Sequence, residues 1–395
     1  MRFRSFLPLL AFSAMLLSCG SGDVGLPLLA LDAGSEVVWE GWTPATLAVD
    51  GQEPREAKIH FRGGISSGYP KHSLALKFPE RTPLCGLPAD KDWILNANYI
   101  DKTFMRHKLS YDLFRRMNPE ANRAPLCAYA MVELDGKPEG LYVVMQKMDA
   151  STLGISKGDS SAVVFKEPPV FYEDSIVPQK KDNYYHQTFP KKRKEDRTAQ
   201  AERLHRFLFE SSDPAFRDSV GSLFDLDNIA DWHLLLLFSN NSDGLLKNFF
   251  LYKADDRTPF RVAPWDYDHS FGRDSDNEPN MMARIIDCDR SVLLRRLSAW
   301  APYRQKLAAR WQQLRADGIV SPEAFAQMVE ENRSQIAKAV KANERLWPVD
   351  NAIYYDANGF DQEVDIMLRF ASLSIERLDS LFSNFIHLEQ YQITK

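Results

Sequence analysis

The sequence predicts a mixed α+β protein with a β-rich N-terminal part and a helical C-terminal part. Three observations carry this prediction. Short alternating runs separated by Asp-Gly and Gly-Gly occupy residues 26–78, an apolar helical segment occupies residues 223–240, and an apolar stripe repeats near the C-terminus. No internal repeat or long linker divides the chain, so we expect one mixed unit rather than two independent domains.

The bulk composition is that of a globular protein. The chain has 395 residues, of which 44% are hydrophobic and 26% are charged. Removing the N-terminal leader described below takes away Arg2 and Arg4 and no acid, so the formal net charge moves from −5 to −7. This balance gives no overall attraction to nucleic acid, and we do not expect nucleic acid as a partner.

The first residues resemble a bacterial lipoprotein signal peptide, expected over residues 1–19. Arg2 and Arg4 precede an apolar stretch from Phe6 to Leu17, and Leu-Leu-Ser then leads directly to Cys19. The stretch is shorter than the roughly 20 residues that span a bilayer. We therefore expect lipidation of Cys19 and attachment to the bacterial cell envelope by this lipid anchor only. The alternative is a plain secretory leader in which Cys19 is incidental.

The other cysteines are Cys85, Cys127 and Cys288, an odd number without C-x-x-C spacing. This pattern argues against a zinc site and against a disulfide framework, although it leaves one bridge open.

The individual elements follow in order. Four strand-like runs lie between Leu26 and Phe78, and a helix is expected after an N-cap at Asp101, with four apolar residues spaced four apart on one face. Those residues are Met105, Leu109, Leu113 and Met117. A hairpin is expected around Asp135-Gly136, between two apolar strands.

The segment from Ser151 to about Thr198 is polar and irregular. It includes the basic run Lys191–Lys194, which Glu195 and Asp196 partly offset. We interpret this run as a solvated loop or edge in preference to a binding patch.

The second half is predicted to be largely helical around one hairpin. The apolar residues of 223–240 predict a buried helix. The runs NFFLYK and FRVAPWDYD predict a hairpin, and Ser321-Pro322 indicates the start of another helix. The C-terminal stripe is expected to lie in the core. It consists of Val364, Leu368, Ala371, Ile375, Leu378, Phe382 and Phe385.

Three polar residues occur in an order that suggests phosphoryl transfer. Asp243 is expected in a loop, Asn248 follows five residues later, and Asp266 follows the hairpin. Phosphoryl transfer uses a carboxylate that accepts the hydroxyl proton, then an amide and a carboxylate that hold Mg²⁺. The protein-kinase catalytic loop has the same Asp-to-Asn spacing. No His-Arg precedes Asp243 and no Phe-Gly follows Asp266, so an orthodox kinase is excluded.

Asp266 and Asp268 are expected on one face of an aromatic strand, and carboxylates in such a place need a partner. A metal ion is our preferred partner. The alternative is that the two carboxylates cap a turn and pair with Arg261 or Arg273.

The stretch FRGGISSGYPKHSLALK is a candidate phosphate cradle. It combines small residues, whose amides can approach phosphate oxygens, with Arg62, Lys71 and Lys77. The run Leu-Ala-Leu-Lys77 is also similar to the V-A-I-K strand of protein kinases, whose lysine binds the nucleotide. The alternative is a glycine turn with surface lysines on an edge strand.

Five stretches together resemble the CotH family, spore-coat-protein-H-like kinases with an atypical protein-kinase fold. They are FRGGISSGYPKHSLALKF, LNANYIDKTFMRHKLSYDLF, VELDGKPEGLYVVMQKMD, SDGLLKNFFLYK and APWDYDHSFG. The resemblance implies a kinase-like domain over residues 24–395, with an N-lobe-like part at about 26–150 and a C-lobe-like part at about 151–395.

The resemblance also implies roles for residues. Asp243 matches the catalytic Asp, Asn248 and Asp266 match metal ligands, and Asp268 is a nearby second carboxylate. The implied cofactors are ATP and Mg²⁺, and the implied acceptor is a Ser or Thr of a protein at or outside the cell surface. A glycan acceptor stays open. The nucleotide-binding residues are expected among Arg62, Lys71, Lys77, Arg106, Gln146 and Lys147, the last two where the strand YVVMQKMD leads to the adenine hinge.

The chain departs from the family in its glycine stretch, where Gly-Gly-Ile-Ser-Ser replaces the commoner Gly-Asn-Ser-Ser type. Two other functions stay open. One is a non-catalytic surface-binding protein, a pseudokinase or adhesin, on the same fold. The other is a phosphodiesterase that uses Asp266 and Asp268, which would usually require more clustered His and carboxylate ligands.

Overall fold

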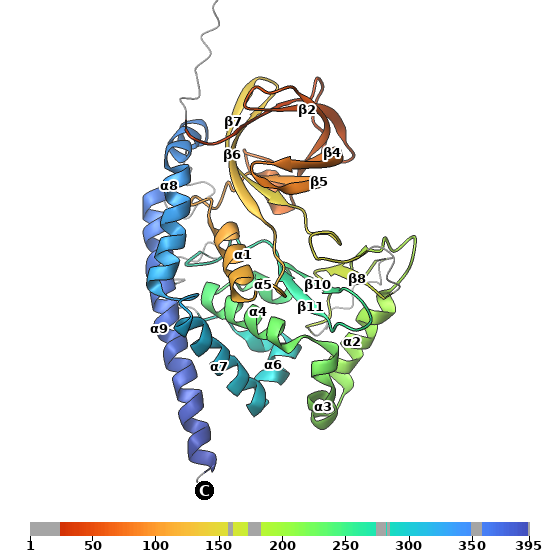
Figure 1. Cartoon of the computed structure of the whole chain (residues 1–395), viewed down its shortest axis with the longest axis vertical. Coiled ribbons are helices and arrows are strands. Elements are labelled where there is room, and N and C mark those ends of the chain that lie inside the picture. Colours follow the sequence, from red (N-terminus) through yellow and green to blue (C-terminus); the bar gives the residue numbers. More distant parts are fainter. Residues whose placement is uncertain are drawn as a thin grey trace, which may run out of the picture.

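The N-terminal β-rich part of the computed structural model is a closed barrel, and the C-terminal part is helical (Figure 1). The structure describes residues 24–156, 161–172, 183–273, 282, 285–348 and 358–393, with side chains up to residue 383. The barrel lies at one end of the molecule, and the long helices α8 and α9 run along one side (Figure 1). The predicted mixed class and its division into a β-rich and a helical part are therefore confirmed.

The barrel contains seven strands in the order β1-β2-β3-β4-β5-β7-β6. It closes because β1 pairs antiparallel with β2 and parallel with β6. The sequence predicts strands here but not their closure, which depends on this pairing between residues about 100 positions apart, such as Leu28 with Met131. The bounds are Leu28–Asp32 (β1), Thr43–Val49 (β2), Arg55–Arg62 (β3), Ser73–Leu84 (β4), Leu87–Asn96 (β5), Cys127–Leu134 (β6) and Lys137–Gln146 (β7).

The alternation of side chains along the strands separates the barrel interior from its outer face. Leu74, Leu76, Trp93 and Leu95 are buried in the barrel core, together with apolar residues of the other strands. The intervening residues of β3, β4 and β5 point outward, and several of them line a cavity described below. The predicted hairpin is confirmed, since β6 and β7 flank the turn at Asp135-Gly136.

A second sheet of four strands has the order β11-β10-β8-β9. The predicted hairpin of β10 and β11 is confirmed by their antiparallel pairing. The other two strands lie in the segment that we expected to be irregular. The bounds are Val163–Lys166 (β8), Gln187–Phe189 (β9), Phe249–Lys253 (β10) and Arg261–Pro264 (β11).

The helices belong mostly to the second half of the chain. Helix α1 packs against α4, and α4 packs against α7, α9 and β11. The bounds are Arg106–Met117 (α1), Thr198–Glu210 (α2), Asp213–Leu223 (α3), Leu226–Ser239 (α4), Asp243–Leu246 (α5), Val292–Ser298 (α6), Ala301–Ala316 (α7), Pro322–Leu346 (α8) and Phe360–Ile393 (α9). Two short 3-10 helices cover Ile65–Gly68 and Cys288–Arg290.

Helix α1 begins later than the sequence suggests. The expected N-cap Asp101 lies before the helix, where its carboxylate accepts hydrogen bonds from the backbone N–H of Thr103 and of Arg106. The four apolar residues predicted for one face are all buried, so the face is correct and only the start is wrong.

Helix α4 is buried as predicted, and its capping places the next functional segment. The Asp225 carboxylate accepts from the N–H groups of Asp227 and Asn228, and Asn240 ends the helix in the left-handed conformation with φ 54°. The chain then turns directly into α5, which begins with Asp243.

The C-terminal helices agree with the sequence patterns. Ser321 caps α8 through its hydroxyl, which accepts from the N–H of Ala324. The apolar stripe of α9 is in the core except for the partly buried Leu368, while the Phe385 side chain lies outside the described residues.

Candidate functional site

Two cavities of similar size lie between the barrel and the second half of the chain. The first, which we call the linker cavity, is about 760 Å³ and is lined by the outer face of β3, β4 and β5 and by residues 147–151. The second, the acidic cavity, is about 770 Å³ and is lined by the glycine stretch and by many polar residues. Four of these are the predicted site residues Asp243, Asn248, Asp266 and Asp268. Arg62, Lys166 and Trp265 line both cavities, so the two adjoin.

The acidic cavity brings together the residues that the sequence predicts for phosphoryl transfer. We expected Asp266 and Asp268 on a strand, and this prediction is wrong. Strand β11 ends at Pro264, and the chain leaves the sheet there. Asp266 has φ 57° and Asn248 has φ 60°, a left-handed conformation that is costly for residues other than glycine. The Asn248 side chain donates from Nδ2 to the Asp266 carbonyl oxygen at 3.1 Å, which ties the two residues together.

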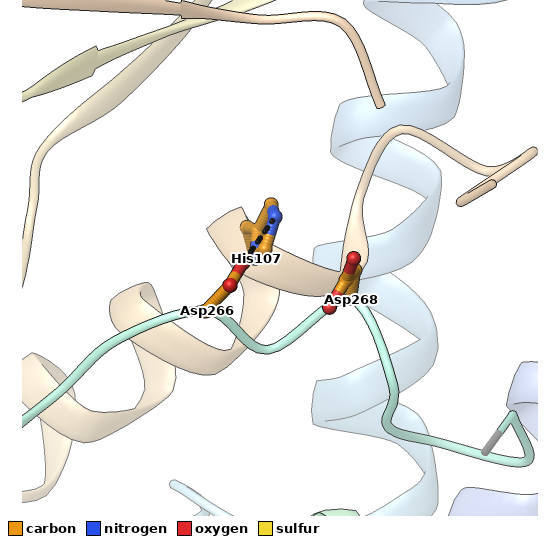
Figure 2. A group of neighbouring side chains, drawn as sticks. All are labelled: His107, Asp266 and Asp268. Carbon is orange, nitrogen blue, oxygen red and sulfur yellow. Dashed lines mark ion pairs between the residues drawn. The ribbon is translucent and has the colours of Figure 1, made fainter. Parts of the chain in front are cut away.

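Helix α1 holds the Asp266 loop from the other side. The Tyr111 hydroxyl accepts from the Asp266 N–H at 2.9 Å, and His107 Nδ1 accepts from the Tyr267 N–H at 2.9 Å. The Nε2 atom of His107 lies 3.6 Å from Asp266 Oδ1 (Figure 2). The strained backbone at Asp266 is therefore stabilised by contacts from an element 155 residues away in sequence.

The two carboxylates form a compact acidic group with His107. One ligand atom from each of Asp266, Asp268 and His107 lies within 4.8 Å of the others (Figure 2). Burial within the site, followed by the negative charge of Asp268, raises the pKa of Asp266. The Asp266 side chain is nevertheless about half exposed, at 51%, so a cation can reach it from the cavity.

These residues fit a hard divalent cation. Carboxylate oxygens and amide oxygens are the ligands that Mg²⁺ prefers. Asp266 and Asp268 offer carboxylates to the cavity, and Asn248 uses its Nδ2 for the Asp266 carbonyl, which leaves its amide oxygen for the cavity side. The alternative pairing is wrong, because Arg261 pairs with Asp225 at 2.7 Å and Arg273 pairs with Glu363.

Asp243 is the first residue of α5 and lines the acidic cavity. Its Oδ2 atom lies 3.1 Å from Lys247 Nζ, one helical turn later. The turn that presents Asp243 is tight. A Cβ atom on Gly244 would meet Leu236 at 3.0 Å and the side chains of Asn241 and Tyr267 at 3.1 Å, so a larger residue would displace the loop.

The glycine stretch forms one wall of the acidic cavity. Gly63 has φ 152°, and a Cβ there would lie 2.5 Å from Ser66 Oγ. Burial, and then the charge of Asp268, raises the pKa of Tyr69, which follows the 3-10 helix. The stretch therefore faces the carboxylates across the acidic cavity.

Among the predicted basic residues, Arg62 is the one that faces both cavities and the acidic group. Burial lowers the pKa of its guanidinium, and the charge of Asp266 opposes that effect. Lys77 lines the linker cavity, where its Nζ lies 3.9 Å from Asp92 and 5.7 Å from the centre of the Trp42 ring.

Lys71 also lines the acidic cavity, but its ammonium group is bound to protein oxygens. Its Nζ is buried and donates to the carbonyl oxygens of Ala97 and Leu141 and to Asn343 Oδ1 of α8. The ammonium also lies 4.2 Å from the centre of the Tyr142 ring. Three oxygen acceptors match the three N–H donors of an ammonium group, so Lys71 ties the barrel to α8.

Arg106 is likewise buried and committed to protein partners. Its guanidinium pairs with Asp101 at 2.6 Å and with Glu363 at 3.2 Å, and its Nε donates to the Ser270 carbonyl at 2.9 Å. Ser270 lies two residues after Asp268, in the same loop as the two candidate metal ligands Asp266 and Asp268. Arg106 therefore supports the loop of Asp266 and Asp268, and its guanidinium is occupied by protein partners.

The two residues expected at the adenine hinge, Gln146 and Lys147, differ in their access to the linker cavity. Gln146 is buried, and its Oε1 accepts from the N–H of Leu126 at 3.2 Å. Lys147 lines the linker cavity, and its Nζ lies 3.6 Å from Asp92 Oδ1.

The basic run at 191–194 is mostly exposed, as interpreted, although Lys191 also lines the linker cavity.

Sequence reasoning missed His107, Lys247 and Lys166 as residues of the site. Lys247 directly precedes Asn248, so its place in the motif could have indicated it. His107 and Lys166 reach the site only through tertiary structure, since their own segments carry no local signal for it.

The cysteine predictions can be compared in part. Cys85, Cys127 and Cys288 are free thiols, so the bridge that the sequence leaves open is absent among these three. Cys19 lies outside the described residues.

Within the described part of the chain, the helices are all too short or too polar to cross a membrane.

Comparison with known proteins agrees with the geometry. The family model described as CotH kinase protein matches residues 59–374. The inner spore coat protein H of Bacillus subtilis is 26% identical over 238 residues, which are 60% of this chain and 64% of that protein. The match thus spans less than two thirds of the relative's length. Because the family model covers most of the sequence, the chain belongs to the CotH family.

Proposed function

We propose that the protein is a Mg²⁺-dependent phosphotransferase that transfers the γ-phosphoryl group of ATP to a hydroxyl acceptor. The observation that carries this proposal is the convergence of Asp243, Asn248 and Asp266 on one cavity, in the chain order that phosphoryl transfer uses. The description of the matching family as a kinase supports it. We further propose that the barrel and the helical part correspond to the two lobes of an atypical protein kinase.

Each residue has a role that follows from its position. Asp243 accepts the proton of the acceptor hydroxyl, and Lys247 beside it offsets negative charge near the transferred group. Asn248, Asp266 and Asp268, which line the same cavity, would hold the metal ion. When bound, Mg²⁺ neutralises the negative charge that the phosphate oxygens carry during transfer.

The nucleotide would span the two adjoining cavities. The linker cavity has a volume suited to a small ligand and is lined by Ala75, Ile94, Phe250 and Trp265, which can enclose a base. Arg62, at the boundary with the acidic cavity, would contact the phosphates, with Lys77 and Lys147 on the base side. Because Lys71 and Arg106 are occupied by protein partners, we assign them positioning roles in this proposal.

We test the nucleotide site by thermal melting of the purified protein with ATP, with and without Mg²⁺, beside Asp266→Ala. A ligand at 100 times its Kd adds roughly 2.7 kcal/mol to the free energy of unfolding. We expect stabilisation of the wild type only when both are present, and none of the variant. If no nucleotide shifts the wild type, phosphotransfer is excluded, and a non-catalytic binding protein takes its place.

The cellular location and the phosphoryl acceptor are also proposals. We propose that the protein is lipid-anchored through Cys19 at the bacterial cell envelope and acts on Ser or Thr of an envelope or extracellular protein, with a glycan as the other acceptor. The spore-coat relative supports a surface location. In cell fractionation, Cys19→Ala should move the protein from the membrane fraction to the soluble one, and an unchanged distribution would contradict the anchor.

A further inference from the structure

We infer that His107 is a positioning residue, whose Nε2–H faces the Asp266 carboxylate as an electrostatic contact and which does not itself bind the metal ion. The inference rests on the proposed function in taking Asp266 as a metal ligand. It goes beyond that function because it decides between two roles for the group of His107, Asp266 and Asp268, whose ligand atoms are close enough to share an ion.

The tautomer of His107 follows from its hydrogen bond to the backbone. Its Nδ1 atom accepts from the Tyr267 N–H at 2.9 Å, so Nδ1 carries a lone pair and no proton. A neutral imidazole has one protonated nitrogen, which must then be Nε2. The Nε2–H group faces the Asp266 carboxylate, with 3.6 Å between Nε2 and Oδ1 (Figure 2).

This tautomer is incompatible with metal binding. An imidazole ligand binds through an unprotonated nitrogen, and here the unprotonated nitrogen already faces a backbone N–H. To free Nε2, the ring would need its proton on Nδ1, which would oppose the Tyr267 N–H. That N–H belongs to a fully buried residue, so leaving it without an acceptor would cost about 1–3 kcal/mol.

The ring is held in this orientation by its surroundings. The His107 side chain is 2% exposed and stacks on Tyr111, with 5.9 Å between ring centres and 11° between ring planes. Tyr111 and Arg106 of the same helix bind the loop at Asp266 and at Ser270. A turned ring would therefore break contacts on both sides.

The consequence is a metal site made of oxygen atoms alone. One carboxylate oxygen of Asp266 faces the Nε2–H of His107, and the other remains for the ion, together with Asp268 and Asn248. Oxygen ligands favour Mg²⁺ and Mn²⁺, whereas Zn²⁺, Ni²⁺ and Cu²⁺ are favoured by imidazole. His107 thus contributes to ion selectivity by withholding its nitrogen.

Two substitutions separate the hydrogen bond that Nδ1 accepts from the contact that Nε2 makes with Asp266. In His107→Gln, the side-chain amide N–H can reach the place of Nε2 and still face Asp266. In His107→Asn, the amide oxygen can take the place of Nδ1 and still accept from Tyr267, but the donor to Asp266 is lost. We expect Mn²⁺ affinity to fall about tenfold or more in His107→Asn and to be largely kept in His107→Gln.

The tautomer is measured directly by ¹⁵N NMR of the imidazole nitrogens in purified protein labelled at histidine, with His107→Gln assigning the signal. We expect a proton on Nε2 both without metal and with Mg²⁺. A proton on Nδ1, or a nitrogen that binds added Zn²⁺, would overturn the inference. So would a His107→Asn variant that binds Mn²⁺ as tightly as the wild type.

The outcomes also separate this inference from the proposed function. If the wild type binds neither Mg²⁺ nor Mn²⁺, the phosphotransferase proposal and the metal-directed part of the inference both fail. If the ion binds through a histidine nitrogen, the inference alone fails. If the tautomer is correct and Mn²⁺ binds but ATP does not, the inference stands and the phosphotransferase proposal falls.

Discussion

The hydroxyl of Tyr111 accepts a hydrogen bond from the backbone N–H of Asp266, with 2.9 Å between Tyr111 Oη and Asp266 N. The bond joins a buried helix to a residue whose backbone is left-handed, with φ 57°. A conformation of this kind costs about 1–3 kcal/mol and persists only where its surroundings enforce it. Helix α1 is therefore part of the candidate site, although of its residues only His107 lines the acidic cavity.

Removing the hydroxyl should loosen the loop and weaken metal binding together. We expect Tyr111→Phe to lower the free energy of unfolding by about 1–3 kcal/mol, because the Asp266 N–H loses its acceptor, and to lower Mn²⁺ affinity. Urea denaturation and Mn²⁺ titration measure the two effects. Tyr129→Phe is the matched control, since the Tyr129 hydroxyl bonds to Asn332 away from the cavities. Equal Mn²⁺ affinities in both variants would count against the role of Tyr111.

Asp243 should matter for transfer and little for stability. A general base contributes about 100-fold to 10,000-fold, so we expect Asp243→Asn to lose phosphotransfer by a factor in that range. Its pair with Lys247 is exposed on the lysine side, and such pairs contribute at most about 1 kcal/mol. Radiolabelled phosphate transfer and thermal melting check both statements. Lys247→Ala is the control for stability alone, since it breaks the same ion pair. Full activity of Asp243→Asn would remove the assigned base.

Arg62 and Lys71 should give opposite results, although both lie in the same predicted cradle. We expect Arg62→Ala to weaken ATP binding with little loss of stability, because its guanidinium faces the acidic cavity. We expect Lys71→Met to lower stability and to leave ATP affinity near that of the wild type, because the ammonium binds Ala97, Leu141 and Asn343. Isothermal titration and denaturation distinguish them, and the reverse pattern would show that Lys71 contacts phosphate.

His233 should make the fold sensitive to acid. It is buried in α4, with its Nδ1 3.3 Å from the Tyr303 hydroxyl, and burial lowers its pKa to about 4. The unfolded chain, with a His pKa of about 6.5, then binds a proton at a higher pH than the folded protein does. Stability present above pH 6.5 is therefore lost as pH falls toward 4, by up to about 3 kcal/mol.

The measurement for His233 is the free energy of unfolding from pH 4 to pH 8. We expect His233→Gln to show a shallower decline than the wild type between pH 6.5 and pH 4, and a parallel curve above pH 7, where neither state binds the proton. Identical slopes in the two proteins below pH 6.5 would mean that another group causes the acid sensitivity.

Much of the fold could be predicted because its signals are local. The alternation in β3 and β4, the Asp135-Gly136 turn and the apolar face of α4 each depend on neighbouring residues, and each was confirmed. The closure of the barrel could not be predicted. It depends on the pairing of β1 with β6, and no periodicity within either strand specifies a partner about 100 residues away. The short strands β8 and β9 were missed because they contain only 4 and 3 residues, too few for an alternating pattern to show.

The sequence by itself determined the order and spacing of the acidic residues, since Asp243, Asn248 and Asp266 are set by chain positions around one hairpin. Only the tertiary structure decided which basic residues accompany them. Arg62, Lys71 and Arg106 look alike in sequence, yet burial commits Lys71 to protein oxygens and Arg106 to Asp101 and Glu363, while Arg62 lines both cavities. The physical reason is that a buried cation must find partners, and those partners come from segments distant in the chain. The same holds for His107, whose hydrogen bond with the Tyr267 N–H joins a helix to a loop 160 residues away.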